Sequence, residues 1–308
     1  MTNDAIEFAE VPPAGWDERL RVFRAGNEVD TFVLRTQRAM IVIDTMATPQ
    51  HGQRLLAAIT PDLVGRELIV INTHADWDHC WGNAAFIAAG APQHVTIIGS
   101  SGTYARMTSD EERAYLATRQ AKEPRFAPVT LVPPTVHFAG RAVIECGDLS
   151  LELIPTPGHT ADHIAIWIPA LSLLLAGDAA EQPFPHVDTA ATLPTLRHSL
   201  TAMAALNPAM VIPCHGGTTD PALLTRNSAY FDTIEARVRT AIAARSLADD
   251  WRERADIADH IGYPFTDAVR DVGSNPDTVP TFYRSFHPSA VRTMIAWVIG
   301  SENGSIAG

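Results

Sequence analysis

The segment 67–83, ELIVINTHADWDHCWGN, decides the fold. Its first half is a short apolar run rich in β-branched residues, which predicts a buried β-strand. The strand delivers the chain directly into an acidic, histidine-bearing stretch that contains His74, Asp76, Asp78 and His79. Side chains at the carboxyl end of a strand can meet side chains from the ends of neighbouring strands at one edge of a sheet. We therefore predict a site for metal chemistry at that edge.

Three further segments repeat this arrangement. PTPGHTADH (155–163) follows an apolar run and carries His159, LLLAGDAA (173–180) carries Asp178, and MVIPCHGG (210–217) leads to His215. Any one of them alone would be a solvated loop, a turn or a structural histidine. A metal ion that activates water needs neutral imidazoles and carboxylates held rigidly, with one coordination position left for the water. The recurrence of these residues after separate strands indicates such a site.

The ordered set THADWDH, TPGHT, AGDAA and PCHG resembles the metallo-β-lactamase superfamily of metallo-hydrolases, over roughly residues 30 to 220. The resemblance implies an α/β fold, an αβ/βα four-layer sandwich with a dinuclear metal site at one edge. Residues 1–248 would form this catalytic domain. Amphipathic runs near 251–260 and 287–299 predict that residues 249–308 form a helical C-terminal extension packed on it.

Carried over by position, the resemblance assigns seven ligands to two divalent metal ions. The first ion would be held by His74, Asp76 and His159, and the second by Asp78, His79 and His215. Asp178 would bridge the two ions. Asp44, which ends the run IVIDT, matches a family aspartate that supports the site by contacting a ligand.

Asp76 departs from the family pattern, because most members carry a second histidine there. Two histidines and a carboxylate form a harder ligand set, which resembles the triad of non-haem iron sites. Zinc also accepts this set, so we expect zinc, with iron or manganese as alternatives. The weaker carboxylate donor leaves a single-metal enzyme as another alternative, as described for a hydrolytic aryl dehalogenase of this superfamily.

The predicted function is a metal-dependent hydrolase that uses a metal-activated hydroxide on a small-molecule substrate: an ester, lactone, amide, phosphoester or activated aryl halide. Asp78 or Asp178 would be the catalytic proton carrier. One alternative is a non-haem iron oxidoreductase of the flavodiiron or sulfur-dioxygenase type, because flavodiiron relatives carry a glutamate where Asp76 stands, although no flavodoxin-like segment follows here. A binding module without catalysis is disfavoured, because every ligand position holds a polar residue.

Aromatic and imidazole side chains near the ligands predict the substrate pocket. Trp77 and Trp81 flank the first motif, and Phe184 and His186 follow Asp178. Both tryptophans could instead pack the edge of the sheet. His163 would bind substrate or hydrogen-bond to a ligand, with a buried structural histidine as the alternative.

Composition limits the partners. A formal charge of −12 and a pI near 5.4 argue against a surface that binds nucleic acid. Three cysteines are poor material for a disulfide framework and indicate a reducing compartment. Because we find neither a signal peptide nor a run of the roughly 18 apolar residues that a membrane span needs, we expect a cytoplasmic protein without a membrane partner. A homodimer through the C-terminal extension is an open alternative.

Hydrophobic periodicity predicts the remaining elements. Strands and turns fill residues 19–45 and 142–176. Helical patterns occupy residues 49–60, 101–120, 191–206 and 219–247. The proline-rich stretch 121–135 predicts a loop.

Overall fold

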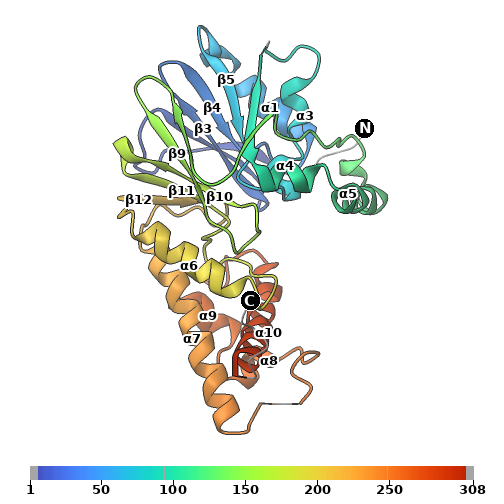
Figure 1. The fold of residues 1–308 in the computed structure, drawn as a ribbon, viewed down its shortest axis with the longest axis vertical. Helices are drawn as coiled ribbons and strands as arrows, with labels where there is room; N and C mark the ends of the chain where they lie inside the picture. The colour runs from blue at the N-terminus through green and yellow to red at the C-terminus, as the bar shows by residue number, and fades with distance from the viewer. Residues whose placement is uncertain (1–5, 93, 248, 303–308) are drawn as a thin grey trace. The chain divides into compact units, whose positions relative to one another are not determined.

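A seven-stranded sheet pairs its strands in sequence order (Figure 1). The first four strands form an antiparallel meander, and the last three pairings are parallel. The strands are β1 (Phe8–Val11), β2 (Leu20–Ala25), β3 (Val29–Arg35), β4 (Ala39–Ile43), β5 (Glu67–Ile71), β6 (Thr96–Ser100) and β7 (Val136–Phe138). The predicted meander and the predicted strand at 67–71 are confirmed. The sequence analysis missed β1, β6 and β7, because β1 and β7 are largely exposed and β6 contains a glycine.

A second sheet has five strands in the order β12-β11-β10-β9-β8. They are β8 (Ala142–Glu145), β9 (Ser150–Pro155), β10 (Ile164–Ile168), β11 (Leu173–Gly177) and β12 (Met210–Pro213), with the short helix η3 (Pro169–Leu171) between β10 and β11. From β8 to β11 neighbouring strands run antiparallel. These strands confirm the strand-rich region predicted over 142–176.

The computed structural model describes residues 6–92, 94–247 and 249–302. The chain divides into two compact units. The first contains residues 1–155 and 162–175, and the second contains residues 156–161 and 176–308, so the division falls inside β11. It does not test the domain boundary predicted at 248–249, which stays a prediction. Residue 248 and the chain ends 1–5 and 303–308, which the domain and signal-peptide expectations include, lie outside the described residues.

Helices α1, α4 and α5 of the first unit begin at residues that cap them. Thr48, Ser100 and Ser109 each accept a hydrogen bond from a backbone N–H in the first turn of the helix that follows. The elements are α1 (Pro49–Ile59), η1 (Thr60–Leu63), α2 (Trp77–Cys80), α3 (Ala84–Ile87), α4 (Ser101–Met107), α5 (Asp110–Lys122) and η2 (Pro124–Phe126). The predicted helices at 49–60 and 101–120 are confirmed, and one turn of η2 interrupts the predicted loop.

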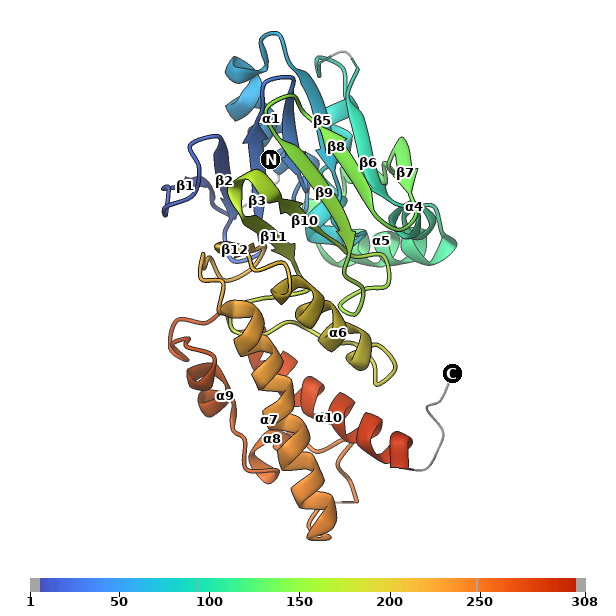
Figure 2. The same cartoon turned by 60° about the vertical axis from the view of Figure 1, so that its left-hand side comes forward.

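The second unit is dominated by helices (Figure 2). They are α6 (Leu193–Ala204), α7 (Leu223–Ala243), α8 (Ile257–His260), α9 (Phe265–Asp271) and α10 (Tyr283–Glu302). Helix α7 packs on both α6 and α10. The helices predicted at 191–206 and 219–247 are confirmed. The amphipathic run at 251–260 is helical only from Ile257, because the chain turns over 251–256, where Arg254 pairs with Asp256 at 2.8 Å (Nε–Oδ1).

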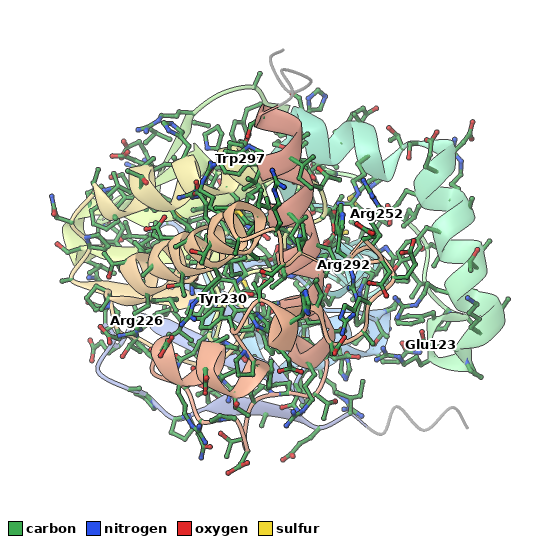
Figure 3. The ribbon with its side chains drawn as sticks, turned by 90° about the horizontal axis from the view of Figure 1, so that it is seen from below. Glu123, Arg226, Tyr230, Arg252, Arg292 and Trp297 are labelled. Carbon is green, nitrogen blue, oxygen red and sulfur yellow. The ribbon has the colours of Figure 1, made fainter. Side chains whose placement is uncertain are left out.

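Aromatic rings join these helices. Phe184 is fully buried and stacks on Tyr230 with the ring centroids 4.2 Å apart. Tyr230 belongs to α7, and Figure 3 labels it together with Trp297 of α10. His287 lies in the same cluster, where Nε2 donates to the carbonyl of Tyr263 at 2.7 Å. Nδ1 of a neutral ring therefore accepts from the Tyr230 hydroxyl, at 2.9 Å.

Among the described residues, every helix is too short or too polar to cross a lipid bilayer.

His287 makes the stability of the fold depend on pH. Burial lowers the pKa of His287, with the Tyr263 carbonyl and Asp259 acting in the opposite direction. As pH falls below about 6.5, the unfolded chain binds a proton at this residue before the folded chain does, so the free energy of unfolding decreases, by up to about 1.4 kcal/mol per pH unit. We expect His287→Gln to flatten this slope between pH 7 and pH 5 in urea denaturation. Parallel pH profiles for the two proteins would contradict the assignment.

Candidate metal centre

The first unit carries four of the predicted ligands in the eight residues after β5. The rings of His74 and His79 are fully buried, with centroids 4.1 Å apart. Nε2 of His74 lies 3.4 Å from Oδ2 of Asp76. Nε2 of His79 lies 3.9 Å from Oδ2 of Asp78. The single turn of α2 thus gives each imidazole a carboxylate beside its Nε2 atom.

Asp44 determines where the protons of these imidazoles lie. Its carboxylate accepts from Nδ1 of His79 at 2.8 Å and from the Thr73 hydroxyl at 2.7 Å. The hydroxyl proton of Thr73 thus points to Asp44. Nδ1 of His74 lies 2.9 Å from the hydroxyl oxygen of Thr73 and therefore donates its own proton to that oxygen. Both rings therefore carry a proton on Nδ1, and in the neutral form each presents its lone pair on Nε2, as a metal ligand does. This geometry supports the predicted role of Asp44.

The backbone around Asp44 is fixed by close contact with the motif. Asp44 has a φ of 64°, in the left-handed region. Its backbone N–H donates to Ile71 at 2.8 Å, and the N–H of Thr45 donates to the carbonyl of His79 at 2.7 Å. A Cβ atom on Gly82 would lie 1.9 Å from the carbonyl oxygen of Thr45. Only glycine allows this approach, which holds the β4 loop against the ligand segment.

Arg106 lies among three carboxylates, a feature that the sequence analysis did not predict. Its guanidinium is 2.5 Å from Asp76 (Nη2–Oδ1), 3.5 Å from Glu112 (Nε–Oε2) and 3.6 Å from Asp162 (Nη1–Oδ1). Burial lowers the pKa of Arg106, but the charges of Asp76 and Asp162 outweigh it and the pKa lies above its ordinary value. The arginine is a cation, and it holds one oxygen of Asp76 while the other faces His74.

Asp162 connects this cluster to the ligand segment. Its Oδ2 atom accepts from the backbone N–H of Ala75 at 2.8 Å and from the hydroxyl of Thr103 at 3.0 Å. Asp162 lies in the segment PTPGHTADH, for which the sequence analysis assigned a role to the two histidines only. Arg106 stands on a polar helix, where an arginine is ordinarily solvated, so the sequence offered no signal for it.

The tryptophans that flank the motif pack on Phe126. Trp81 is fully buried and meets Phe126 edge-on, with centroids 5.2 Å apart. Trp77 meets the same ring at 5.6 Å and lies under the guanidinium of Arg119 at 4.5 Å. This packing fits the alternative that both rings support the edge of the sheet, and a pocket role for them stays a prediction. His163 is buried with its ring 4.9 Å from that of His74.

The second unit carries the other three predicted ligands. Oδ2 of Asp178 lies 3.5 Å from Nε2 of His159 and 3.2 Å from Nε2 of His215. Nδ1 of His159 donates to the backbone carbonyl of His186 at 3.4 Å, which leaves the lone pair on Nε2. Gly158 makes the turn before His159, because its φ is 135° and a Cβ there would lie 2.3 Å from the Cα of Leu196.

A buried glutamate beside these ligands was not predicted. One donor atom each of Glu181, His159 and Asp178 lie within 4.8 Å of one another. Burial raises the pKa of Glu181 to about 7, although the charge of His215 acts to lower it. Glu181 stands in the loop EQPFPH, where a charged residue is normally solvated, so the sequence gave no signal for its burial.

The two pocket residues predicted in this loop lie in different surroundings. Phe184 belongs to the aromatic cluster of the helices, which gives it a structural role. His186 is partly exposed, with Nδ1 3.2 Å from Oδ1 of Asp188 and its ring 4.5 Å from that of Phe286. Their contact with a substrate stays a prediction.

A family model described as the metallo-beta-lactamase superfamily matches residues 25–215. The chain belongs to this superfamily, most of whose members are metallo-hydrolases that typically depend on two metal ions. The resemblance predicted from the motifs is confirmed. No curated protein matches the chain.

Solved structures show the same fold. A metallo-beta-lactamase from Pontibacter korlensis has a TM-score of 0.54 and 19% identity, covering 72% of this chain and 98% of its own. A metallo-beta-lactamase family protein from Thermus thermophilus has a TM-score of 0.61 and 17% identity, covering 97% and 95%. A double mutant of the sec-alkyl sulfatase PisA1 has a TM-score of 0.67 and 17% identity, covering 97% of this chain and 51% of its own. The predicted metallo-β-lactamase fold is confirmed.

The donor groups within each unit fit a divalent metal ion. Two donors that each lie about 2.0–2.2 Å from one cation are about 3–4 Å apart. The histidine–carboxylate separations of 3.4 and 3.9 Å in the first unit, and of 3.2 and 3.5 Å in the second, lie in this range. Asp178 and Glu181 also place two carboxylates together in a buried setting, which needs a compensating positive charge.

Replacing Asp44 by asparagine tests the control of the imidazole protons. In Asp44→Asn an NH₂ group replaces the oxygen that accepts from Thr73 and His79, so the protons of both rings shift to Nε2. We expect zinc affinity, measured by competition with a chromophoric chelator, to fall about 10–100-fold. Asp30→Asn is the control, since Asp30 is a buried aspartate of the same sheet that pairs with Arg24. Equal affinity in Asp44→Asn and wild type would refute the assignment.

Removing the cation beside Asp76 should destabilise the metal-free chain. Arg106→Gln leaves three carboxylates close together without their counter-charge. The arginine side chain is 35% exposed, so solvent screens its interactions and the loss of stability is smaller than for a fully buried ion pair. We expect the free energy of unfolding to fall by about 1–3 kcal/mol. Arg113→Gln, which removes an exposed pair with Asp110, should change it by less than about 0.5 kcal/mol. Similar urea midpoints for the two variants would argue against the cluster.

Proposed function

We propose that the chain is a metal-dependent hydrolase of small-molecule substrates. Its metal ligands would be His74, Asp76, Asp78, His79, His159, Asp178 and His215, which hold two divalent ions, most simply zinc. The observation that carries this proposal is the proton arrangement that Asp44 and Thr73 impose on two buried imidazoles. Histidines that serve only packing do not need both Nε2 lone pairs directed at carboxylates.

Divalent metal ions bound there would make water a nucleophile near neutral pH and polarise a substrate oxygen. The chain's own groups would complete the reaction. Asp78 or Asp178 would accept a proton at a carboxylate oxygen and pass it to the leaving group. Both side chains are buried, at 8% and 4% exposed.

The substrate classes that this chemistry supports are esters, lactones, amides, phosphoesters and activated aryl halides. We include sulfate esters among the proposed substrates because one structural neighbour is a sec-alkyl sulfatase. The net charge of −12 favours a small molecule over nucleic acid. Cys80, Cys146 and Cys214 are buried free thiols, which supports the proposed reducing, cytoplasmic location. The proposed homodimer is tested by measuring the oligomeric state.

Metal content and turnover test the proposal together. The chain is reconstituted separately with zinc, manganese and iron(II), its metal is quantified by mass spectrometry, and hydrolysis is screened over the substrate classes above. We expect up to two ions per chain and turnover of at least one class. Bound iron with oxygen consumption and no hydrolysis would favour the non-haem iron oxidoreductase, and a chain that retains no metal would sink both ideas.

Asp178→Ala provides the sharper test of the ligand set. Since Asp178 contacts two histidines, its loss should remove at least one ion per chain and reduce turnover about 100-fold or more. Asp232→Ala is the control, because Asp232 is an exposed aspartate that pairs with Arg197. Unchanged metal stoichiometry in Asp178→Ala would show that this residue does not bind metal.

A further inference from the structure

Hydrogen bonds to a neighbouring helix fix the backbone at Glu181. Its N–H donates to Oδ1 of Asn227 at 3.0 Å, and Nδ2 of Asn227 donates to the carbonyls of Glu181 and Pro183, each at 2.9 Å. Asn227 is a fully buried residue of α7. The side chain of Asn227 thus holds the backbone of the loop after Asp178 and fixes the position of the Glu181 Cα atom.

The carboxylate itself is held by the C-terminal helix. The hydroxyl of Tyr283, at the start of α10, donates to Oε2 of Glu181 at 2.5 Å. Tyr283 is fully buried, and its ring meets Phe184 edge-on with centroids 5.8 Å apart. Phe184 in turn stacks on Tyr230. A tyrosine packed in this way has little freedom, so the carboxylate that it contacts is oriented well enough to serve as a ligand.

Glu181 lies beside a second buried carboxylate and an imidazole. Glu181 and Asp178 are 2% and 4% exposed, and their donor atoms lie within 4.8 Å of each other and of His159. His159 donates Nδ1–H to a carbonyl and presents a lone pair on Nε2, as a neutral ring does. Two carboxylates and an imidazole whose donor atoms lie this close together form a set that a divalent ion can coordinate.

We propose that Glu181 is a further ligand of the metal ion held by His159 and Asp178, and that α10 positions it through Tyr283. This inference rests on the proposed metal-binding function. One oxygen of Glu181 would bind the ion while Oε2 accepts from the tyrosine, since carboxylates that bind metals are commonly hydrogen-bonded in this way. Metal affinity would then depend on a residue more than 100 positions away in the chain.

Three variants test this assignment: Glu181→Gln, Tyr283→Phe and the control Tyr230→Phe. Tyr230 is also a buried tyrosine of the aromatic cluster, but its hydroxyl bonds to His287 instead of Glu181. We expect Glu181→Gln to weaken one zinc equivalent by about 100-fold and Tyr283→Phe by about 10-fold, measured by chelator competition. Tyr230→Phe should leave zinc affinity unchanged. The visible spectrum of the cobalt(II)-loaded chain should change in Glu181→Gln, because an oxygen ligand is lost.

The stability of the metal-free chain separates a ligand from a structural residue. Glutamine can still accept from the Tyr283 hydroxyl and removes a buried charge, so metal-free Glu181→Gln should melt no lower than metal-free wild type, while zinc should raise its melting temperature less. If wild type itself binds no zinc, the proposed function fails. If wild type binds zinc and Glu181→Gln binds it equally with an unchanged cobalt spectrum, the Glu181 assignment fails. Should Glu181→Gln not fold, equal zinc affinities of Tyr283→Phe and Tyr230→Phe would overturn it.

Discussion

The chemistry of the first unit depends on the hydrogen bonds that Asp44 accepts. A single carboxylate accepts hydrogen bonds from Thr73 and His79 and thereby also fixes the position of the proton on His74. Strand pairing makes this contact, because β4 and β5 run parallel with Ile43 beside Ile71, and Asp44 and Thr73 follow these residues. The left-handed backbone at Asp44 costs about 1–2 kcal/mol. The sheet thus determines which nitrogen of each imidazole is available to a metal.

If Asp76 binds a metal ion as proposed, it supplies an oxygen donor where most members of the family supply an imidazole. A neutral histidine is the usual family residue, whereas Asp76 brings a negative charge that Arg106 offsets at 2.5 Å. Glu112 and Asp162 hold the arginine in place from its other side. An oxygen donor is harder than an imidazole, so a metal site that includes Asp76 would prefer harder ions. The choice of metal at such a site would therefore depend on Arg106, which holds one oxygen of Asp76, as well as on Asp76 itself.

The sequence predicted the parts of the molecule in which a local pattern carries the information. Apolar runs predicted the strands, and the polar residues that end them predicted the positions of Asp44, His74 and His159. Arg106 and Glu181 escaped prediction because a charged residue on a polar helix or in a loop is solvated by default, and only tertiary packing buries it. The stacking of Phe184 on Tyr230 could not be predicted either, because Tyr230 lies 46 positions away and nothing local indicates the contact.

The loop after β11 connects the proposed metal ligands of the second unit with its helices. Within a few residues it carries Asp178, Glu181 and Phe184, and Phe184 alone contributes about 2–3 kcal/mol through burial. If α10 opened locally, Tyr283 would leave Glu181, and the edge-on support of Phe184 would be lost as well. A metal ion that binds only the closed form stabilises the closed form by mass action. If Asp178 and Glu181 bind a metal ion as proposed, loss of the metal would loosen α10 and opening of α10 would weaken metal binding, because Tyr283 contacts Glu181.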